Sequence, residues 1–413
     1  MAQAQPRGDR SSGGGAATDR GRMLAVTTIH SDAIDTEDII AELLAPGAGG
    51  DGSPVAGVLF ASLDYDSAAL VAAVNARHPG IALAGCTANG TLSHLDYHTD
   101  GVLLMLLSGD GVDFEIGVGR GLRADIAGAA RAAATGAARR GERPALVLVF
   151  PDALAGDMVE VVDAIVGAYG PSPPPIFGGS AADDWRFTGT SQFARDQVLT
   201  DAVVVLACYG PLEVTSGVAA GWQPIGAPMT VTAADGAVVR RIDGRTPREI
   251  LDQHFPGFGI HELLDHPLAV FPNPLDPKDF YLRALMRLGD DGSAVAYGSV
   301  PLNATVRLTI ATSAQVLAAA VDSLDAALDG AAAPPELLLV ISCAGRQTIL
   351  GTECGVEQLG MRSRLAARGL PDVPMVGFYS YGEIGRIEGG SPRFHNETCV
   401  TVAVRSVPRA GGV

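Results

Sequence analysis

VAGVLFASL, residues 55–63, opens the stretch that decides the fold, which continues with DSAALVAAVNARHPG at 66–80 and IALAGCTANG at 81–90. The first and third segments are short apolar runs, which are typical of strands buried on both faces. The middle segment is rich in helix formers and ends at Pro79 and Gly80. A strand, a helix and a second strand in this order predict a layer of α/β structure.

This pattern recurs, and each copy returns through a further β-branched strand. The first copy closes with GVLLMLLSG at 101–109. The second is FEIGVGRGL (114–122), a helix over 124–140, PALVLVFPD (144–152), a helix over 156–169, PIFGGSAADD (175–184) and DAVVVLACYG (201–210). The third is VRLTIAT (306–312), a helix over 313–328, PELLLVISCAG (335–345), a helix over 357–368, PMVGFYSYGEIG (374–385) and NETCVTVAVR (396–405). Thr312 and Gln315 match a capping box at the start of the 313–328 helix.

The region between the second and third copies has a different pattern. Alternating apolar runs at 212–226, 228–244 and 279–300 contain the turn sequences Ala-Asp-Gly and Asp-Asp-Gly, which are typical of antiparallel hairpins. We therefore expect an α/β fold of repeated strand-helix-strand units in layered mixed sheets, with an antiparallel sheet-rich central segment. The predicted organisation is a disordered tail at 1–22, one domain at 23–240 and a second at 241–406, with a seam near Val239 to Asp243.

Composition narrows the class of protein. The formal charge is −17, which disfavours nucleic acid and anionic membrane as partners. Five scattered cysteines without a CxxC pair do not form a disulfide framework, so a reducing compartment is expected. The N-terminus lacks the apolar core of a signal peptide, and the apolar runs are too short to cross a bilayer. The sequence thus predicts a soluble cytoplasmic protein.

Small-residue turns at the strand ends are the candidate binding elements, because they expose backbone N–H groups and let a ligand approach closely. The richest turn is GFYSYGEIG, followed ten residues later by FHNET. Tyrosine walls, a hydroxyl and a carboxylate beside backbone donors suit a zwitterion such as an amino acid. The candidate ligand-binding residues are Gly179, Ser180, Gly377, Tyr379, Ser380, Tyr381, Glu383, His395 and Asn396. The alternative is that Ser380 caps a helix and Glu383 is solvated.

Three motifs fall short of known catalytic or metal patterns. GVGRG at 117–121 has Leu122 where a dinucleotide fingerprint needs its third glycine. HELLDH at 261–266 separates its histidines by five residues, whereas a zinc helix needs four. A hydrolase elbow has glycine two positions before and two positions after its serine; Ser180 has only the first, and the glycine that leads Ser380 is three residues away. We predict neither a metal site nor catalysis, and a serine hydrolase-like enzyme stays as an alternative.

These residues, in this order, resemble the FIST family. PMVGFYSYGEIG with FHNETCVTVAV is similar to the C-terminal FIST domain, as is HPLAV followed by DFYLRALM, which places Arg283 at that domain's arginine. ALAGCTANGTL, PIFGGSAADD and DAVVVLACYG are similar to the N-terminal FIST domain. The resemblance spans about Pro54 to Arg405.

The resemblance implies a sensory module in signal transduction that binds a small ligand, with amino acids the suspected class, and adds Arg283 to the candidate site. Because no length remains for an output domain, we expect the signal to pass to a separate output protein. Some relatives are taken to bind haem and sense nitric oxide. A haem-binding sensor is therefore the first alternative, with His254, His261, His266 or His395 as an axial ligand.

Overall fold

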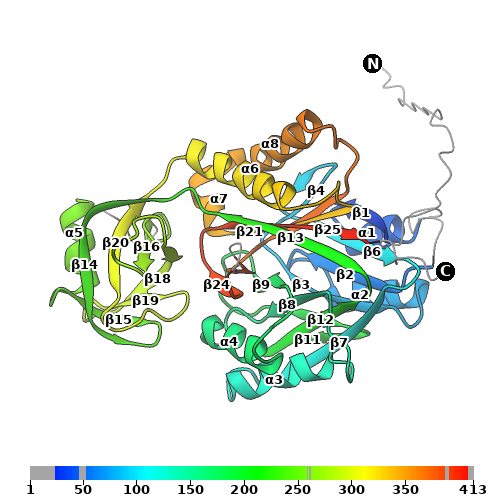
Figure 1. Ribbon diagram of the computed structural model, residues 1–413, viewed down its shortest axis with the longest axis horizontal. Helices are drawn as coiled ribbons and strands as arrows, with labels where there is room; N and C mark the ends of the chain where they lie inside the picture. Colours follow the sequence, from blue (N-terminus) through cyan, green and yellow to red (C-terminus); the bar gives the residue numbers. More distant parts are fainter. Residues whose placement is uncertain (1–23, 46–52, 258, 260–261, 387–389, 408–413) are drawn as a thin grey trace.

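The computed structural model describes residues 24–45, 53–257, 259, 262–386 and 390–407, and shows a body of three α/β units with a separate antiparallel lobe (Figure 1). The predicted tail at 1–22 and His261 lie outside the described residues. The mixed α/β architecture and the antiparallel central segment expected from the sequence are confirmed.

The first unit is a mixed sheet with two helices on its outer face. It contains β1 (Ala25–Ser31), α1 (Thr36–Leu43), β2 (Ala56–Ala61), α2 (Ser67–Arg77), β3 (Ala82–Thr87) and β6 (Val102–Ser108). The strand order is β1-β6-β2-β3, with β2 and β3 parallel and the other pairs antiparallel. Helix α2 begins where the Asp66 carboxylate accepts hydrogen bonds from the N–H groups of Ala68 and Ala69.

The second unit repeats this topology. It contains β7 (Asp113–Arg120), α3 (Ile126–Gly136), β8 (Leu146–Pro151), α4 (Met158–Ala168), β9 (Ile176–Gly179) and β12 (Ala202–Tyr209). Within this unit, the order β9-β8-β12-β7 again has one parallel pair, β8 with β9. A Cβ at Gly117 would lie 1.8 Å from the Ala133 carbonyl oxygen. The glycines of GVGRG therefore allow helix α3 to pack closely on its strand.

The third unit corrects one expectation. It contains β13 (Leu212–Ala219), α6 (Ser313–Asp329), β21 (Leu337–Cys343), α7 (Gly345–Leu350), the 3₁₀ turn η2 (Gly351–Glu353), α8 (Cys354–Ala367), β22 (Met375–Ser380) and β25 (Cys399–Ser406). The order is β13-β25-β21-β22. The prediction that residues 306–312 open this unit is wrong, because β13 pairs with β25 along its whole length. The capping box of Thr312 and Gln315 at the start of α6 is confirmed.

The lobe is inserted between β13 and α6. It contains β14 (Gln223–Asp235), β15 (Val238–Ile242), α5 (Pro247–His254), β16 (Leu268–Phe271), β17 (Tyr281–Arg283), β18 (Leu285–Leu288), β19 (Ala294–Ala296) and β20 (Thr305–Ile310). All of its strand pairs are antiparallel, in the order β17-β16-β20-β14-β15-β19-β18. The lobe has its own apolar core around Val231, Ile250 and Leu285. The division into domains at residue 240 stays a prediction.

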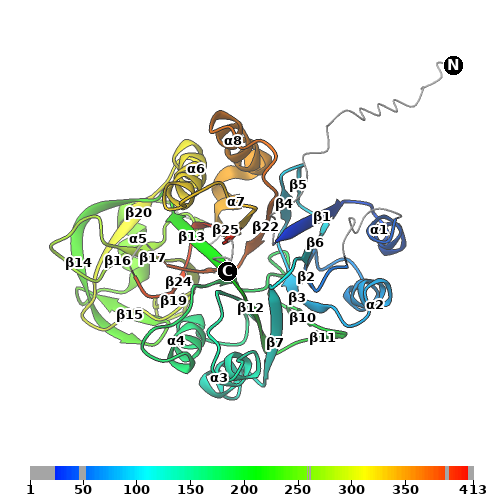
Figure 2. The same cartoon turned by 45° about the vertical axis from the view of Figure 1, so that its right-hand side comes forward.

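Each unit gives one hairpin to a neighbouring sheet. The three hairpins are β4 (Thr91–Ser93) with β5 (Tyr97–His98), β10 (Gln192–Ala194) with β11 (Gln197–Leu199), and β23 (Glu383–Gly385) with β24 (Arg393–His395). The first unit's hairpin pairs with β22, the third unit's with β9, and the second unit's with β3. The exchange thus closes a ring of three units, and their helices lie on the outside around the strands (Figure 2).

The inner faces of the three sheets share one apolar core. Phe60, Phe150 and Phe378, one from each unit, meet there, with ring centroids 4.1 Å apart for Phe60 and Phe378 and 5.7 Å apart for Phe60 and Phe150. This common core and the exchanged hairpins fix the strand ends of different units against one another. In particular, the turn after β22 lies beside the turn after β9.

Candidate functional site

The strand tips of the second and third units form a continuous hydrogen-bonded contact. Ser180 N–H donates to the Gly382 carbonyl at 2.9 Å, and Tyr381 N–H donates to the Ser180 carbonyl at 3.1 Å. A Cβ at Gly179 would lie 2.7 Å from the Ser380 Cβ, so only glycine allows this approach. The structure therefore brings Gly179, Ser180, Ser380 and Tyr381 together.

A small cavity lies next to this contact. Its lining comes from both units and the lobe: Trp185, Leu264, Ala284, Tyr297, Cys343, Gly345, Tyr381, Asn396 and Glu397. We call it the Glu397 chamber. The space open to the centre of a water molecule is about 10 Å³, which matches roughly one water-sized group. Two of the predicted site residues, Tyr381 and Asn396, line it.

Glu397 is the distinctive group of the chamber. Its side chain is fully buried, and neither carboxylate oxygen has a hydrogen-bond partner among the described residues. Burial, and then the neighbouring carboxyl of Glu383, raise the pKa of Glu397 well above its usual value. The carboxylate fits because Gly345 has no side chain: a Cβ there would lie 2.2 Å from Oε1. Glu397 has a φ of 59°, a left-handed conformation that costs energy in a non-glycine residue.

Aromatic rings form one wall of the chamber. The Tyr381 hydroxyl donates to Asp183 at 2.9 Å and accepts from the Trp185 N–H. The Tyr381 ring centroid lies 5.3 Å from that of Trp185, 5.4 Å from that of Phe187 and 6.5 Å from that of Tyr297. Asp183 also accepts from the N–H groups of Phe187, Thr188 and Gly189, which holds the turn that carries Trp185 and Phe187.

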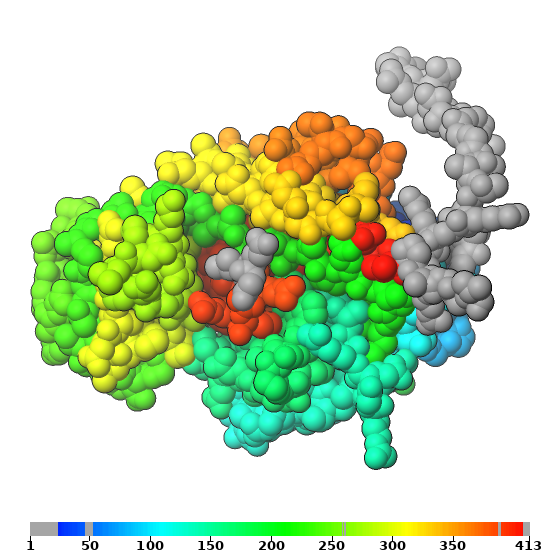
Figure 3. Space-filling model, in the orientation of Figure 1, coloured from blue at the N-terminus to red at the C-terminus, as the bar shows by residue number. Residues whose placement is uncertain are grey.

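An open cleft of about 470 Å³ borders the chamber, between the loop before α4 and the lobe, which contributes Ala237 before β15 and residues of strands β18 and β19. Tyr297 lines both spaces, and its buried hydroxyl has no partner among the described residues. Phe187 lines the cleft and stacks on Tyr381 at the chamber wall. In Figure 3, segments near the C-terminal end of the chain, in orange-red, are visible where the lobe meets the body.

Glu383 lies near the chamber, but both oxygens of its carboxyl group already accept hydrogen bonds from neighbouring residues. Its carboxyl accepts from the Ser380 hydroxyl at 2.9 Å and from the Thr398 hydroxyl at 2.8 Å. Burial raises the pKa of Glu383 to about 7, although the hydrogen bonds from Thr398 and Ser380 oppose the shift. The expected alternative, a solvated Glu383 and a helix-capping Ser380, is wrong, because both residues are fully buried and Ser380 ends a strand.

The other predicted site residues lie further from the chamber. Arg283 donates to the carbonyls of Ser299, Leu282 and Phe394, and burial lowers its pKa to about 10. It therefore ties the lobe to β24. Tyr379 donates to Glu357 on helix α8, at the other face of the sheet. Gly377 packs on Val340 and Leu92. His395 is buried against the Gly385 carbonyl, and burial lowers its pKa to about 4.

The three units place an acidic residue at the same backbone position. At the start of the last strand of each unit, the carbonyls of Gly101, Ala202 and Thr398 accept from the N–H groups of Ser62, Asp152 and Cys343, respectively. The residues one step earlier are Asp100, Asp201 and Glu397. Asp201 accepts a hydrogen bond from the Arg123 N–H at 2.7 Å, and its own N–H donates to Asp152. Of the three, Glu397 alone is buried.

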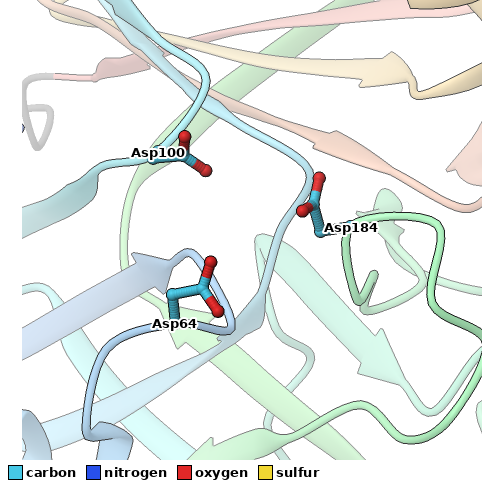
Figure 4. Close-up of side chains that lie close together, drawn as sticks. All are labelled: Asp64, Asp100 and Asp184. Carbon is cyan, nitrogen blue, oxygen red and sulfur yellow. The ribbon is translucent and has the colours of Figure 1, made fainter.

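In the first unit, Asp100 belongs to a group of carboxylates that sequence analysis did not find. One oxygen each of Asp64, Asp100 and Asp184 lie within 4.8 Å of one another, so these residues could hold a metal ion (Figure 4). Arg186 lies 2.8 Å from Asp64 and 3.6 Å from Asp184 and offsets part of the negative charge. Asp64 and Asp100 are exposed, as acidic groups often are without a metal.

The geometry does not favour the two alternative functions. The buried Ser180 hydroxyl has no partner among the described residues. The Ser380 hydroxyl donates to Glu383, but Ser380 is fully buried and lines neither the chamber nor the cleft. His254, His266 and His395 line neither the chamber nor the cleft. His266 stacks on Phe255 with centroids 3.6 Å apart. These residues do not fit a haem pocket.

Sequence reasoning missed Trp185, Tyr297 and Glu397. Glu397 stands within the quoted motif FHNET, but only its neighbours were singled out. A signal was present: Glu397, like Asp100 and Asp201, is an acidic residue just before the closing apolar strand. Trp185 and Tyr297 carried no such signal, because they reach the chamber from a turn of the second unit and from the lobe.

Comparison with known proteins identifies the family. The FIST N domain matches residues 55–245, and the FIST C domain matches residues 244–386. The chain therefore belongs to the FIST family, whose domains are associated with sensory signal transduction. Two uncharacterized proteins of Mycobacterium tuberculosis, from strains CDC 1551 / Oshkosh and ATCC 25618 / H37Rv, are each 30% identical over 366 residues, which cover 82% of this chain and 88% of theirs.

An uncharacterized protein of Mycobacterium bovis (strain ATCC BAA-935 / AF2122/97) is 31% identical over 238 residues, which cover 52% of this chain and 56% of the relative. A solved structure, the cyanuric acid hydrolase from A. caulinodans, aligns over 93% of this chain and all of the other, with 12% identity and a TM-score of 0.35. That score is too low to support an inference.

Among the described residues, no helix is long and apolar enough to cross a membrane.

Proposed function

We propose that this chain is a non-catalytic sensor that binds a small metabolite, an amino acid or a similar compound, between the lobe and the body. One observation carries the proposal: an open cleft of about 470 Å³ adjoins a buried chamber with an unpartnered carboxylate. Ligand sites are typically concave and mostly apolar, with a few polar groups that fix orientation. Membership of the FIST family supports the sensory role.

The position of the cleft suggests how binding is communicated. The lobe supplies Met286, Val295 and Tyr297, whereas the body supplies Met158 and Phe187. A ligand that contacts both parts favours the arrangement in which they lie closest, and this shifts the population of lobe positions. In this proposal a separate output protein in the cytoplasm reads that change.

Binding without turnover is tested on the purified full chain. Thermal unfolding is followed with a panel of amino acids, and small molecules that copurify are identified by mass spectrometry after denaturation. A ligand at 100 times its dissociation constant adds about 2.7 kcal/mol of stability. We expect a saturable shift and an unchanged compound after incubation. Chemical conversion of the bound compound contradicts a non-catalytic sensor, and the absence of both a shift and a copurified molecule contradicts ligand binding.

A further inference from the structure

We infer that the Glu397 chamber takes the primary ammonium group of an amphipathic amine whose apolar tail fills the open cleft. This inference rests on the proposed sensor function and replaces the amino acid named there by an amine that has no carboxylate. It is carried by the unpartnered carboxylate of Glu397, by the aromatic rings beside it and by the absence of positive side chains from the cleft.

The carboxylate sets the charge of the ligand. An ionised carboxylate only accepts hydrogen bonds, and a buried one without partners is costly. The second unit shows what the same backbone position looks like when it is satisfied: Asp201 accepts from the Arg123 N–H, and the Arg123 guanidinium lies 4.0 Å from it. Glu397 has no such donor among the described residues. A ligand ammonium, with three N–H donors, supplies what is missing.

The aromatic wall and the size of the chamber select the head group. Trp185, Tyr297 and Tyr381 line the chamber together with Glu397. Aromatic faces attract cations, most strongly where water is excluded. The space for water centres is about 10 Å³, so the chamber admits a group about as large as one water molecule. A primary ammonium fits this size, whereas a trimethylammonium group is too large.

The lining of the cleft determines the chemistry of the rest of the ligand. Phe187, Met286, Val295 and Phe394 provide apolar surface, and the charged residue at its lining is Asp157. Among the described residues, the cleft is lined by no lysine, arginine or histidine. Arg283 lies behind Gly298, with its donors engaged by carbonyl groups. The carboxylate of an α-amino acid would therefore face an apolar, negatively charged wall, so an amine without a carboxylate is the better ligand.

Tyr297 lies where the two spaces meet. It lines both the cleft and the chamber, and its hydroxyl is buried without a partner among the described residues. An amine that reaches Glu397 from the cleft must pass this ring. The hydroxyl then gains a neighbour, because its oxygen can accept a hydrogen bond from the ammonium.

The test uses five probes that separate head group from tail: phenethylamine, n-hexylamine, phenylalanine, 3-phenylpropionic acid and phenethyltrimethylammonium. Calorimetric titration and thermal unfolding are measured on the full chain. We expect one or both primary amines to bind, and phenylalanine, the acid and the quaternary amine to bind at least about tenfold more weakly. In Glu397→Gln, amine affinity falls at least about tenfold, since the ammonium loses its counter-charge. Asp201→Asn is the matched control and keeps the affinity.

Several outcomes overturn the inference. They are binding of neither primary amine, phenylalanine binding as tightly as phenethylamine, or an amine affinity that Glu397→Gln leaves unchanged. Gly345→Ala gives an independent check, because its Cβ would displace the carboxylate and should also weaken the amine. The sensor function itself is tested separately, by saturable binding of any amino acid or amine probe and by the copurified molecule. A chain that binds phenylalanine in preference to amines keeps that function and loses this inference.

Discussion

The second and third units use the same acidic position in opposite ways. Asp201 lies at the start of the closing strand among donors, and Asp152 below it accepts from the Asp201 N–H, the Leu154 N–H and the Thr190 hydroxyl. Glu397 lies at the matching place without a donor, above Cys343. The two positions correspond, so the difference comes from their surroundings: the backbone N–H of Arg123 reaches Asp201, and no described donor reaches Glu397. In the second unit the acidic residue finds its hydrogen-bond donor within the protein. In the third unit the carboxylate is left available to a ligand.

Replacing Asp152, which accepts a hydrogen bond from the Asp201 N–H, should have the largest effect on stability. Asp152→Ala leaves three donors without an acceptor in a buried place, and each costs about 1–3 kcal/mol. We expect the free energy of unfolding in urea to fall by about 4 kcal/mol. Cys343→Ala is the matched change in the third unit and should cost about 1 kcal/mol, because a small thiol mainly fills space. Equal losses at both positions contradict the comparison.

The buried carboxyl of Glu383 should make a contribution to stability that falls as pH rises. The pKa of Glu383 is about 7 in the folded chain against 4.5 for the free side chain, and burial is the main cause. Between these values the folded state binds more protons than the unfolded state, so stability falls as pH rises. We expect Glu383 to contribute a loss of about 3 kcal/mol from pH 4.5 to 7, which the buried His395, with its pKa lowered to about 4, opposes in the wild-type total.

Urea unfolding of Glu383→Gln across this pH range checks that prediction. The stability of the variant relative to the wild type should rise from pH 4.5 to 7, because its amide does not titrate whereas the other buried groups titrate in both proteins. Cys343 faces the same carboxyl, but burial raises its pKa well above 9, so its thiol does not contribute in this window. A difference in stability between the wild type and Glu383→Gln that stays constant from pH 4.5 to 7 contradicts the prediction.

Replacing Asp201 itself should lower stability by a moderate amount. Asp201→Ala removes the acceptor for the Arg123 N–H and places alanine at a φ of 50°. The lost bond and the left-handed backbone each cost about 1 kcal/mol. We expect thermal unfolding to report a loss of about 2 kcal/mol. Asp201→Asn, which keeps an acceptor and tolerates this backbone, serves as the control and should stay within about 0.5 kcal/mol of the wild type.

The smallest change in stability is expected for a substitution of Glu397, and it is a gain where the other substitutions give a loss. In the ligand-free chain, Glu397→Gln replaces an ionisable buried group without partners by a neutral one of the same shape. We expect this to stabilise the fold by about 1 kcal/mol at pH 8, measured by urea unfolding. A clear loss of stability would mean that the carboxylate contributes to folding, as Asp201 does, and would remove the contrast between the two units.

Much of the fold could be predicted because its pattern is local. The apolar runs, the helix between them and the turns after Gly85, Gly179 and Ser380 recur along the sequence. The opening strand of the third unit could not be assigned, because the inserted lobe separates β13 from α6, and β20 lies closer to that helix in sequence. Pairing of β13 with β25 connects residues nearly two hundred positions apart, and no periodicity reports it.

The candidate site was predictable only in part. Ser180, Ser380 and Tyr381 lie together because their strand ends do. Asn396 was selected instead of Glu397. Glu397 has a positive φ, and the alternation of side chains along a strand does not show which side chain points inward at such a residue. Tyr297 depends on how the lobe docks on the body, which is set by contacts such as Arg283 with Phe394 and not by local sequence.

The exchange of hairpins has a consequence for how this chain can be divided. Each of the three sheets is missing an edge until a neighbour supplies it, so a fragment that holds one unit alone exposes unpaired backbone at β3, β9 or β22. Such fragments are candidates for aggregation. The three-unit body should accordingly melt in a single cooperative transition, whereas the lobe, with a core of its own, is the piece most suited to be expressed alone or exchanged between relatives.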